Sequence, residues 1–213
     1  MLEAYLITIT GVILAQASPG PNLLAVASAG LGQGRAAALA TVAGVATGMF
    51  IWATAVAFGL AAVLALYPTL LTAMKIIGGS YLCWMALKAV KAAWADNTMS
   101  IQAGTQSMSL LAHWRRGLLV IMTNPKAALM WTAVGTFLFG SGLSAWQVVA
   151  FGPLAALTAI MIYGGYGLLF SSGFATRTYS RFARWIELAF GGAFAALGGT
   201  LLLDGLRELR KAG

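Results

Sequence analysis

The sequence predicts an all-α, polytopic membrane protein with about six transmembrane helices, arranged as two inverted three-helix repeats whose first and fourth helices are broken. Three observations lead to this fold class. First, 60% of the residues are hydrophobic and 8% are charged, which leaves too little polar surface to dissolve a globule. Second, no Asp, Glu, Lys or Arg occurs in the ranges 4–34, 36–74 and 127–176, and a spanning helix needs only about 20 apolar residues. Third, a helix-breaking motif occurs twice.

Hydropathy and helix-breaking residues together define the expected spans, at 4–31, 37–60, 70–91, 110–139, 146–170 and 185–206. The longest polar segment, 95–109, has the composition of a mobile linker. We therefore expect a single membrane transporter domain over 1–213, with the first three-helix repeat at 1–94, the linker at 95–109 and the second repeat at 110–213.

The two halves are expected to have opposite orientations. The last helix of each half contains a glycine pair followed closely by an aromatic residue, in Gly78-Gly79-Ser80-Tyr81 and Gly191-Gly192-Ala193-Phe194. An odd number of spans in each half means that a tandem duplication places the second half upside down. The distribution of Lys and Arg near the helix ends favours both termini on the periplasmic side.

The helix breaks are Ser18-Pro19-Gly20-Pro21-Asn22 and Thr123-Asn124-Pro125-Lys126, and Pro125 follows Pro19 by 106 residues in a chain of 213. Proline removes a backbone donor, and glycine weakens a helix. In lipid, such a break is stable only where its backbone groups line a cavity or are buried in protein. Corresponding breaks in two halves indicate a transporter site near the bilayer midplane.

Each restarted helix exposes backbone N–H groups with a partial positive charge, which can bind a carboxylate. The polar side chains beside the breaks either cap these helix ends or hydrogen-bond a ligand, and the repetition of the motif favours a ligand. These side chains belong to Ser18, Asn22, Thr123 and Asn124.

Lys126 is the most informative single residue, because it lies near the middle of an apolar run. A charge at that depth costs roughly 2.5–3.5 kcal/mol. In the alternative, the Lys126 side chain extends along its own helix to place its ammonium at the membrane interface. The distance to the end of the apolar run would strain that conformation, so a functional or paired lysine is favoured. Among the acidic residues, only Asp204 is placed to carry protons or to pair with Lys126. Its spacing from Arg207 favours an interfacial ion pair instead.

Several classes of function are disfavoured. The net charge of +8 arises mostly between the apolar runs, so it indicates topology and not a nucleic-acid surface. Cys83 has no cysteine partner, and the few carboxylates argue against a metal site. The single histidine, His113, is not accompanied by a carboxylate pair or a nucleophile–base set, and no phosphate-binding loop is present. We expect no enzyme, metal or cofactor. A homo-oligomer stays open, as do two alternative functions: a non-transporting membrane scaffold or assembly protein, and an exporter of another small solute.

The N-terminus resembles a signal peptide only in part. An apolar stretch leads to Ala15-Gln16-Ala17, a small-x-small site, but Glu3 and the absence of Lys or Arg before that stretch argue against cleavage.

Four motifs carry a resemblance to a known family. They are Ser18-Pro19-Gly20-Pro21-Asn22, Gly44-x-x-x-Gly48, Gly78-Gly79-Ser80-Tyr81-Leu82 and Asn124-Pro125-Lys126-Ala127-Ala128-Leu129. In this order they resemble the LysE/RhtB family of amino-acid exporters, over essentially the whole chain. The resemblance implies a six-helix bacterial inner-membrane protein that exports small amino acids or their derivatives, powered by the proton-motive force.

By position, the resemblance places Pro19, Gly20, Pro21 and Asn22 on one side of a substrate site, and Asn124, Pro125 and Lys126 on the other. The mechanism expected is alternating access, in which the substrate carboxylate meets the restarted helices and Lys126 while one three-helix half rocks against the other.

The chain departs from the family pattern at two places. Many members carry an acidic residue directly after the second-span glycine, where this chain has Met49, and many have a Phe-Pro-Gln-like segment where this chain reads Gly135-Thr136-Phe137-Leu138-Phe139. The resemblance therefore fixes neither the proton route nor the choice among homoserine, threonine, leucine, cysteine derivatives and lysine.

Overall fold

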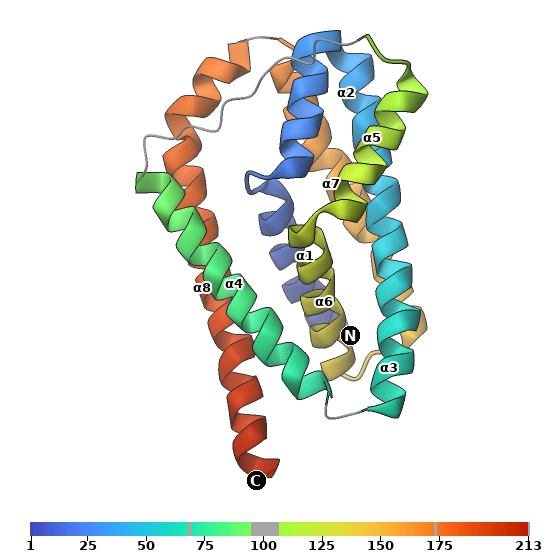
Figure 1. Ribbon diagram of the computed structural model, residues 1–213, viewed down its shortest axis with the longest axis vertical. Coiled ribbons are helices and arrows are strands. Elements are labelled where there is room, and N and C mark those ends of the chain that lie inside the picture. Colours follow the sequence, from blue (N-terminus) through green and yellow to red (C-terminus); the bar gives the residue numbers. More distant parts are fainter. Residues whose placement is uncertain (68–69, 95–106, 173, 213) are drawn as a thin grey trace.

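The computed structural model describes residues 1–67, 70–94, 107–172 and 174–212, and all regular structure in these ranges is helical (Figure 1). Helices occupy most of all six expected ranges, which confirms the all-α class, while the inverted repeat stays a prediction. Most of the expected linker, 95–106, lies outside the described residues. The elements are α1 (Leu2–Ala17), α2 (Pro21–Ala55), the π-helix η1 (Val56–Leu60), α3 (Ala61–Leu66), α4 (Leu70–Trp94), α5 (Leu110–Thr123), α6 (Pro125–Gly140), α7 (Ala145–Phe170) and α8 (Phe174–Ala212).

Helix α2 is two rods joined at Gly34. This residue has φ 82° and ψ −171°, a conformation that glycine adopts at little cost and other residues rarely adopt. In Figure 1 the chain runs upwards before this point and returns downwards after it. As one straight helix, the 35 residues of α2 would be about 50 Å long, well beyond a hydrocarbon core of roughly 30 Å. The reversal at Gly34 divides them into two shorter helices.

Both expected breaks are present. The first separates α1 from α2, and the second separates α5 from α6, which are bent by 62° relative to each other. By length and apolar composition, Pro21–Leu60 and Ala145–Phe170 are candidate spans among the described residues, and the bent pair α5–α6 counts as a third if it crosses as one unit.

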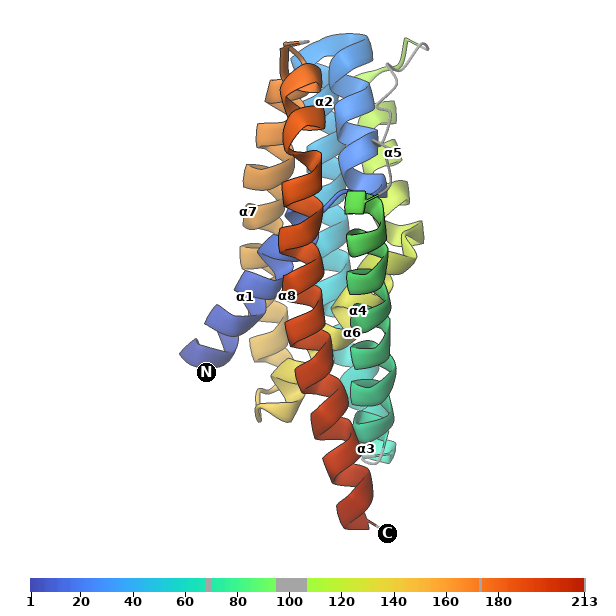
Figure 2. The same cartoon turned by 90° about the vertical axis from the view of Figure 1, so that its left-hand side faces the viewer.

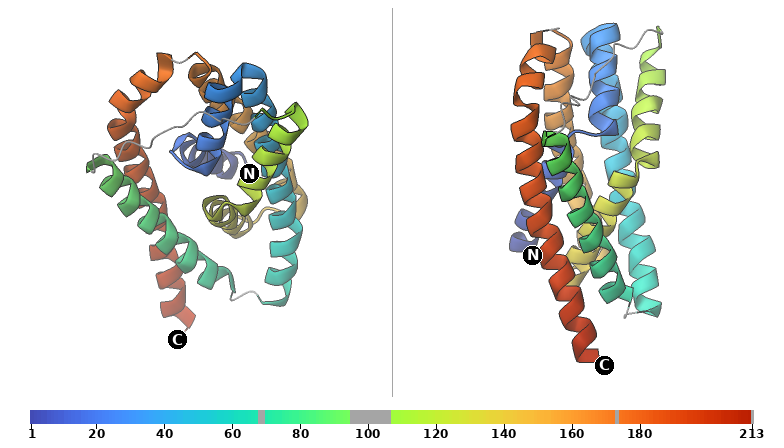
Figure 3. Two further views of the ribbon diagram at one scale, coloured as in Figure 1. Left: turned by 45° about the horizontal axis from the view of Figure 1, so that its top comes forward. Right: turned by 60° about the vertical axis from the view of Figure 1, so that its left-hand side comes forward.

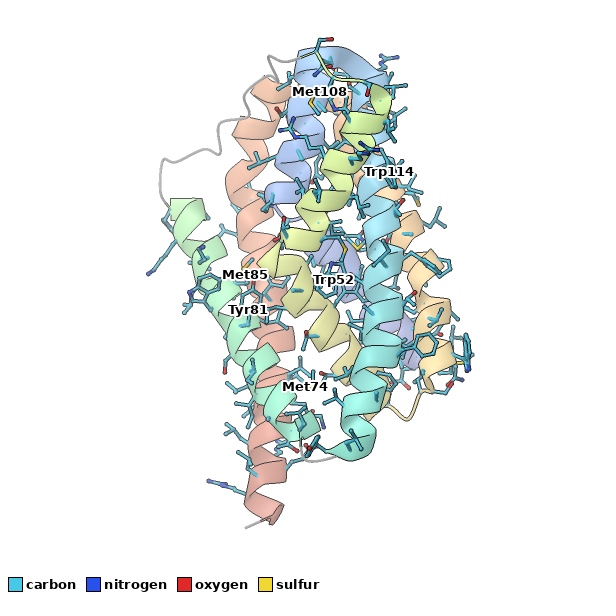
Figure 4. All side chains as sticks on the ribbon, turned by 45° about the vertical axis from the view of Figure 1, so that its right-hand side comes forward. Trp52, Met74, Tyr81, Met85, Met108 and Trp114 are labelled. Atoms are coloured by element: carbon cyan, nitrogen blue, oxygen red, sulfur yellow. The ribbon has the colours of Figure 1, made fainter. Side chains whose placement is uncertain are left out.

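Small residues let α2 and α5 approach closely. A Cβ atom added at Gly44 would overlap the backbone carbonyl of Trp114, and one at Gly117 would overlap that of Thr41. Two tryptophan side chains reinforce this junction (Figure 4): the indole N–H of Trp52 donates to the Ile121 carbonyl, and that of Trp114 donates to the Thr47 hydroxyl, both over 3.3 Å. Small residues at the spacing of Gly44-x-x-x-Gly48 are typical of such close helix packing in membranes.

Helices α4 and α8 form a second tightly packed pair, which stands to one side of the bundle in Figure 3. Their backbones meet at Gly79 and Gly198, where an added Cβ would lie 2.7–2.8 Å from atoms of the opposite helix. Lys75 of α4 also forms an ion pair with Glu208 of α8. Helix α8 is longer than the expected 185–206 and extends beyond α4 towards the C-terminus (Figure 2).

The outer surface carries large apolar side chains along several helices, which is the pattern that a bilayer covers. Exposed examples include Phe50 and Ile51 of α2, Leu119 of α5, and Ile160 and Met161 of α7. The fold thus turns apolar side chains outwards and directs the polar groups of the helix breaks inwards.

Candidate functional site at the two helix breaks

The first break follows from its two prolines. Ser18 ends α1 in an extended conformation (φ −68°, ψ 141°), and Gly20, also extended, precedes the first turn of α2. Both residues stand directly before a proline, which disfavours the helical conformation at the preceding residue. Pro21 begins α2, where a missing N–H has no cost. The last carbonyls of α1 therefore lie beside the first turn of α2.

The second break is capped by Asn124, whose side-chain oxygen accepts a hydrogen bond from the backbone N–H of Lys126 over 3.0 Å. Pro125 begins α6, and its side chain lies outside the described residues. Thr123 does not share the capping role, because its hydroxyl donates to the Leu119 carbonyl of its own helix over 2.7 Å and its side chain is exposed. The capping prediction is confirmed for Asn124 alone at this break.

The structure brings the two breaks into direct contact. The amide of Asn124 donates to the side-chain oxygen of Asn22 over 3.4 Å, and Asn22 donates in turn to the hydroxyl of Tyr163 on α7 over 3.4 Å. Asn22 and Asn124 are both 5% exposed. Residues about 100 positions apart in the chain thus form one buried polar group.

The ammonium of Lys126 reaches across to the end of α1. It donates to the Ser18 hydroxyl, and it lies 3.4 Å from the Ser18 carbonyl and 3.5 Å from that of Pro19. It also lies 5.8 Å from the centre of the Phe194 ring. The end of a helix carries unpaired carbonyls and a partial negative charge, so this position stabilises a buried cation. Lys126 therefore has hydrogen-bonding partners, whereas a function for it stays a prediction.

A small cavity lies between the breaks. The space that the centre of a water molecule can reach in it is about 20 Å³, which is room for about one water. Its polar lining comes from α1, the first break, α2, α6 and α7, and consists of Gln16, Ser18, Asn22, Asn124, Lys126 and Tyr163.

The remaining expected site residues lie at different distances from this cavity. Gly20 lines it, Pro19 contributes its carbonyl to Lys126, and Pro21 is exposed. Asp204 lies near the C-terminal end of α8, where it forms an ion pair with Arg207 over 3.6 Å. The interfacial ion pair favoured for Asp204 is therefore present, and its part in proton coupling stays a prediction.

Chemically, the site suits a small zwitterion. The ammonium of Lys126 and the N-termini of α2 and α6 provide positive potential for a carboxylate. The Gln16 side-chain oxygen and the Tyr163 hydroxyl add hydrogen-bond acceptors to the lining. Among the described residues, no group of three or more His, Cys, Asp or Glu side chains is arranged to hold a metal ion.

Comparison with known proteins finds efflux proteins among the relatives of this chain. A family model described as LysE type translocator matches residues 13–205. The chain belongs to the LysE type translocator family. It is 29% identical over 200 residues to a threonine efflux protein of Salmonella typhi, covering 90% of this chain and 94% of the relative. It is 27% identical over 208 residues to the threonine efflux protein of Escherichia coli K12, covering 96% and 100%.

A third relative is the homoserine/homoserine lactone efflux protein of Salmonella typhimurium, 27% identical over 208 residues, which cover 93% of this chain and 94% of the relative. No solved structure is significantly similar to the chain. As a LysE type translocator with apolar helices, the protein is a bacterial membrane transporter, and its relatives' names support amino-acid export at the level of the family.

Two polar lining residues of this translocator escaped the sequence analysis. Gln16 and Tyr163 lie inside α1 and α7, outside the two helix breaks from which the site was predicted. A sequence sign existed for Gln16, because it is the one amide side chain in the apolar stretch 4–17. Tyr163 resembles the other aromatic residues of the chain, and only the fold places it beside Asn22.

Proposed function

We propose that the protein exports amino acids or small amino-acid derivatives across the bacterial inner membrane. The observation that carries this proposal is the meeting of two broken helices around Lys126, because such breaks in a membrane protein commonly form the substrate site of a transporter. The efflux functions named for the relatives support it.

In the proposed binding mode, the substrate carboxylate lies between the two helix breaks. Ser18, Pro19, Gly20, Pro21 and Asn22 form one side. On the other side, Asn124 and Pro125 shape the N-terminus of α6, and Lys126 supplies the positive charge. Because the ammonium of Lys126 already contacts Ser18 and two carbonyls, the carboxylate would replace some of these contacts when it binds. Thr123 faces away and is the weakest member of the predicted set.

The proposed mechanism is alternating access by inverted repeats. The cavity has room for about one water, so a substrate enters only after a rearrangement. In Figure 1 the first half of the chain runs up, down and up, and the second half runs down, up and down, which supports the inverted repeat. The packing links the two halves, however, because α4 packs on α8 and α2 packs on α5 and α7. Motion of the α4–α8 pair against the remaining helices therefore fits the packing better than rocking of one sequence half against the other.

The energy source in this proposal is the proton-motive force, with both termini on the periplasmic side and Asp204 as the candidate proton carrier. The half-exposed Asp204 carboxylate is accessible to protons, although Arg207 lies beside it. An Asp204→Asn variant that kept its dependence on the proton gradient would exclude this residue as the carrier.

Efflux from preloaded bacterial cells tests the proposed function. Cells producing the wild type, Lys126→Ala or Lys88→Ala at equal membrane abundance are compared over a panel of labelled amino acids. Lys88 is the matched control, because it is exposed on α4 and contacts the Trp84 ring at 4.4 Å, away from the cavity.

We expect the wild type and Lys88→Ala to accelerate efflux of at least one amino acid and Lys126→Ala to abolish that gain. Unchanged efflux in Lys126→Ala would refute the assigned site. No acceleration of any solute by the wild type would favour the scaffold alternative.

A further inference from the structure

A second cavity adjoins the polar one and is almost wholly apolar. It offers about 40 Å³ to the centre of a water molecule, roughly twice the space of the polar cavity. Ala15 and Met130 line both cavities, so they form the wall between them. The other side chains around it include Val12, Leu82, Val134, Phe137, Phe194 and Leu201.

The apolar cavity offers little to a polar ligand group. Thr8 is its one lining side chain with a hydroxyl, and that hydroxyl donates to the Ala4 carbonyl of its own helix over 2.6 Å. A ligand hydroxyl placed here would lose its hydrogen bonds to water without replacement, which disfavours its binding. A hydrocarbon group loses nothing by leaving water.

Gln16 provides an independent sign of a ligand on the polar side. Its side chain is 1% exposed and lines the polar cavity. The amide nitrogen donates to the Ala155 carbonyl over 3.0 Å, and since a carbonyl can only accept, this bond fixes which end of the amide carries the oxygen. The amide oxygen has no hydrogen-bond partner among the described residues. A buried acceptor without a donor is costly, and a ligand ammonium would supply the missing donor.

We propose that the substrate is a neutral amino acid with an apolar side chain. Its ammonium group donates to the Gln16 oxygen, its carboxylate lies at Lys126 and the helix breaks, and its side chain passes between Ala15 and Met130 into the apolar cavity. The inference rests on the proposed function and adds the substrate class. The proposed substrate differs from the threonine and homoserine in the names of the relatives, because the side chains of those two amino acids carry a hydroxyl.

The substrate panel gives the first test. Cells producing the wild type are preloaded with labelled leucine, methionine, alanine, threonine or homoserine, and initial efflux rates are measured at equal internal concentrations. We expect leucine and methionine to leave at least tenfold faster than threonine and homoserine. If threonine or homoserine is exported faster, and Lys126→Ala abolishes that export, the inference fails while the proposed function stands.

Filling the wall between the cavities gives the second test. Ala15→Leu places a branched side chain where the substrate side chain would pass, whereas Ala150→Leu adds the same bulk at an exposed position of α7. We expect Ala15→Leu to slow leucine and methionine efflux at least tenfold more than alanine efflux, since a methyl group does not reach the apolar cavity. Retained alanine efflux also shows that the variant folds; if Ala15→Leu does not accumulate, Ala15→Val serves. Equal losses for all three substrates would overturn the side-chain assignment.

The role of Gln16 is tested with Gln16→Met, which keeps the length of the side chain and removes the acceptor. Loss of a hydrogen bond to a charged group should raise the half-saturating leucine concentration roughly 10- to 100-fold. A purely structural glutamine would alter abundance without discriminating between ligands.

Inhibition of leucine export by 4-methylpentanoate, which is leucine without its amino group, distinguishes a Gln16 that binds the substrate ammonium from a Gln16 that is purely structural. We expect unlabelled leucine to inhibit export far better than 4-methylpentanoate does in the wild type. In Gln16→Met, the two compounds should inhibit export about equally. An unchanged ratio would refute the contact.

Discussion

Two neighbouring glycines in α8 offer a sharp test of the packing. A Cβ atom added at Gly198 would lie 2.8 Å from the backbone nitrogen of Cys83, the carbonyl oxygen of Gly79 and the Cβ atom of Leu82, whereas one added at Gly199 would meet nothing within 4 Å. Ordinary contact begins at 3.4 Å, so Gly198→Ala requires α4 and α8 to separate by about 0.6 Å. Two of the three opposing atoms belong to helix backbone and cannot rotate away.

Overpacking of this kind costs about 1–3 kcal/mol, which for a chain of this size corresponds to a fall in Tm of roughly 2–12 °C. Gly199→Ala should raise the Tm slightly, because alanine favours a helix over glycine by roughly 0.5–1 kcal/mol. Thermal unfolding of both purified variants in the same detergent, followed by loss of the monodisperse chromatographic peak, measures the difference. Equal melting temperatures for the two variants would show that the α4–α8 backbones do not approach as described.

Three further variants probe the helix break and the ion pair. Asn124→Ala removes the cap of α6, whereas Asn124→Ser keeps a capping oxygen. Because both variants lose the amide that donates to Asn22, Asn124→Ala should be less stable than Asn124→Ser by about 1 kcal/mol; equal thermal stability of the two would argue against the cap. Glu208→Gln removes the charge opposite Lys75 and should lower stability by about 0.5–1 kcal/mol, because Glu208 is partly exposed. That loss should shrink in concentrated salt, and a loss unaffected by salt would contradict an electrostatic origin.

The helix breaks could be predicted because proline and glycine act locally. The two prolines of the first break force their predecessors out of the helical conformation wherever the chain lies, so the ends of α1 and α2 follow from the sequence. The meeting of Asn22 with Asn124 was expected from the repeat, since corresponding positions in two halves often face each other.

Other elements depended on tertiary packing. The π-helix η1 leaves no sign in the sequence, because any apolar stretch can accommodate the extra residue of such a turn. Helix α8 exceeds its expected range because hydropathy detects only the apolar portion of a helix, and α8 continues at both ends through charged residues. His113 is fully buried in α5 beside Thr41, a contact between distant segments that the sequence alone does not reveal.

The contact between Lys126 and the end of α1 has a consequence for the working range of the protein. A carboxylate bound there, as proposed, would displace some of the Ser18 and Pro19 contacts of the ammonium, so its net affinity would be the difference between two sets of favourable interactions. The proposed carrier would then bind its substrate weakly and export it mainly when the cytoplasmic concentration is high. Such a carrier would lower an excessive cytoplasmic concentration of its substrate and would leave the concentration that the cell needs for growth.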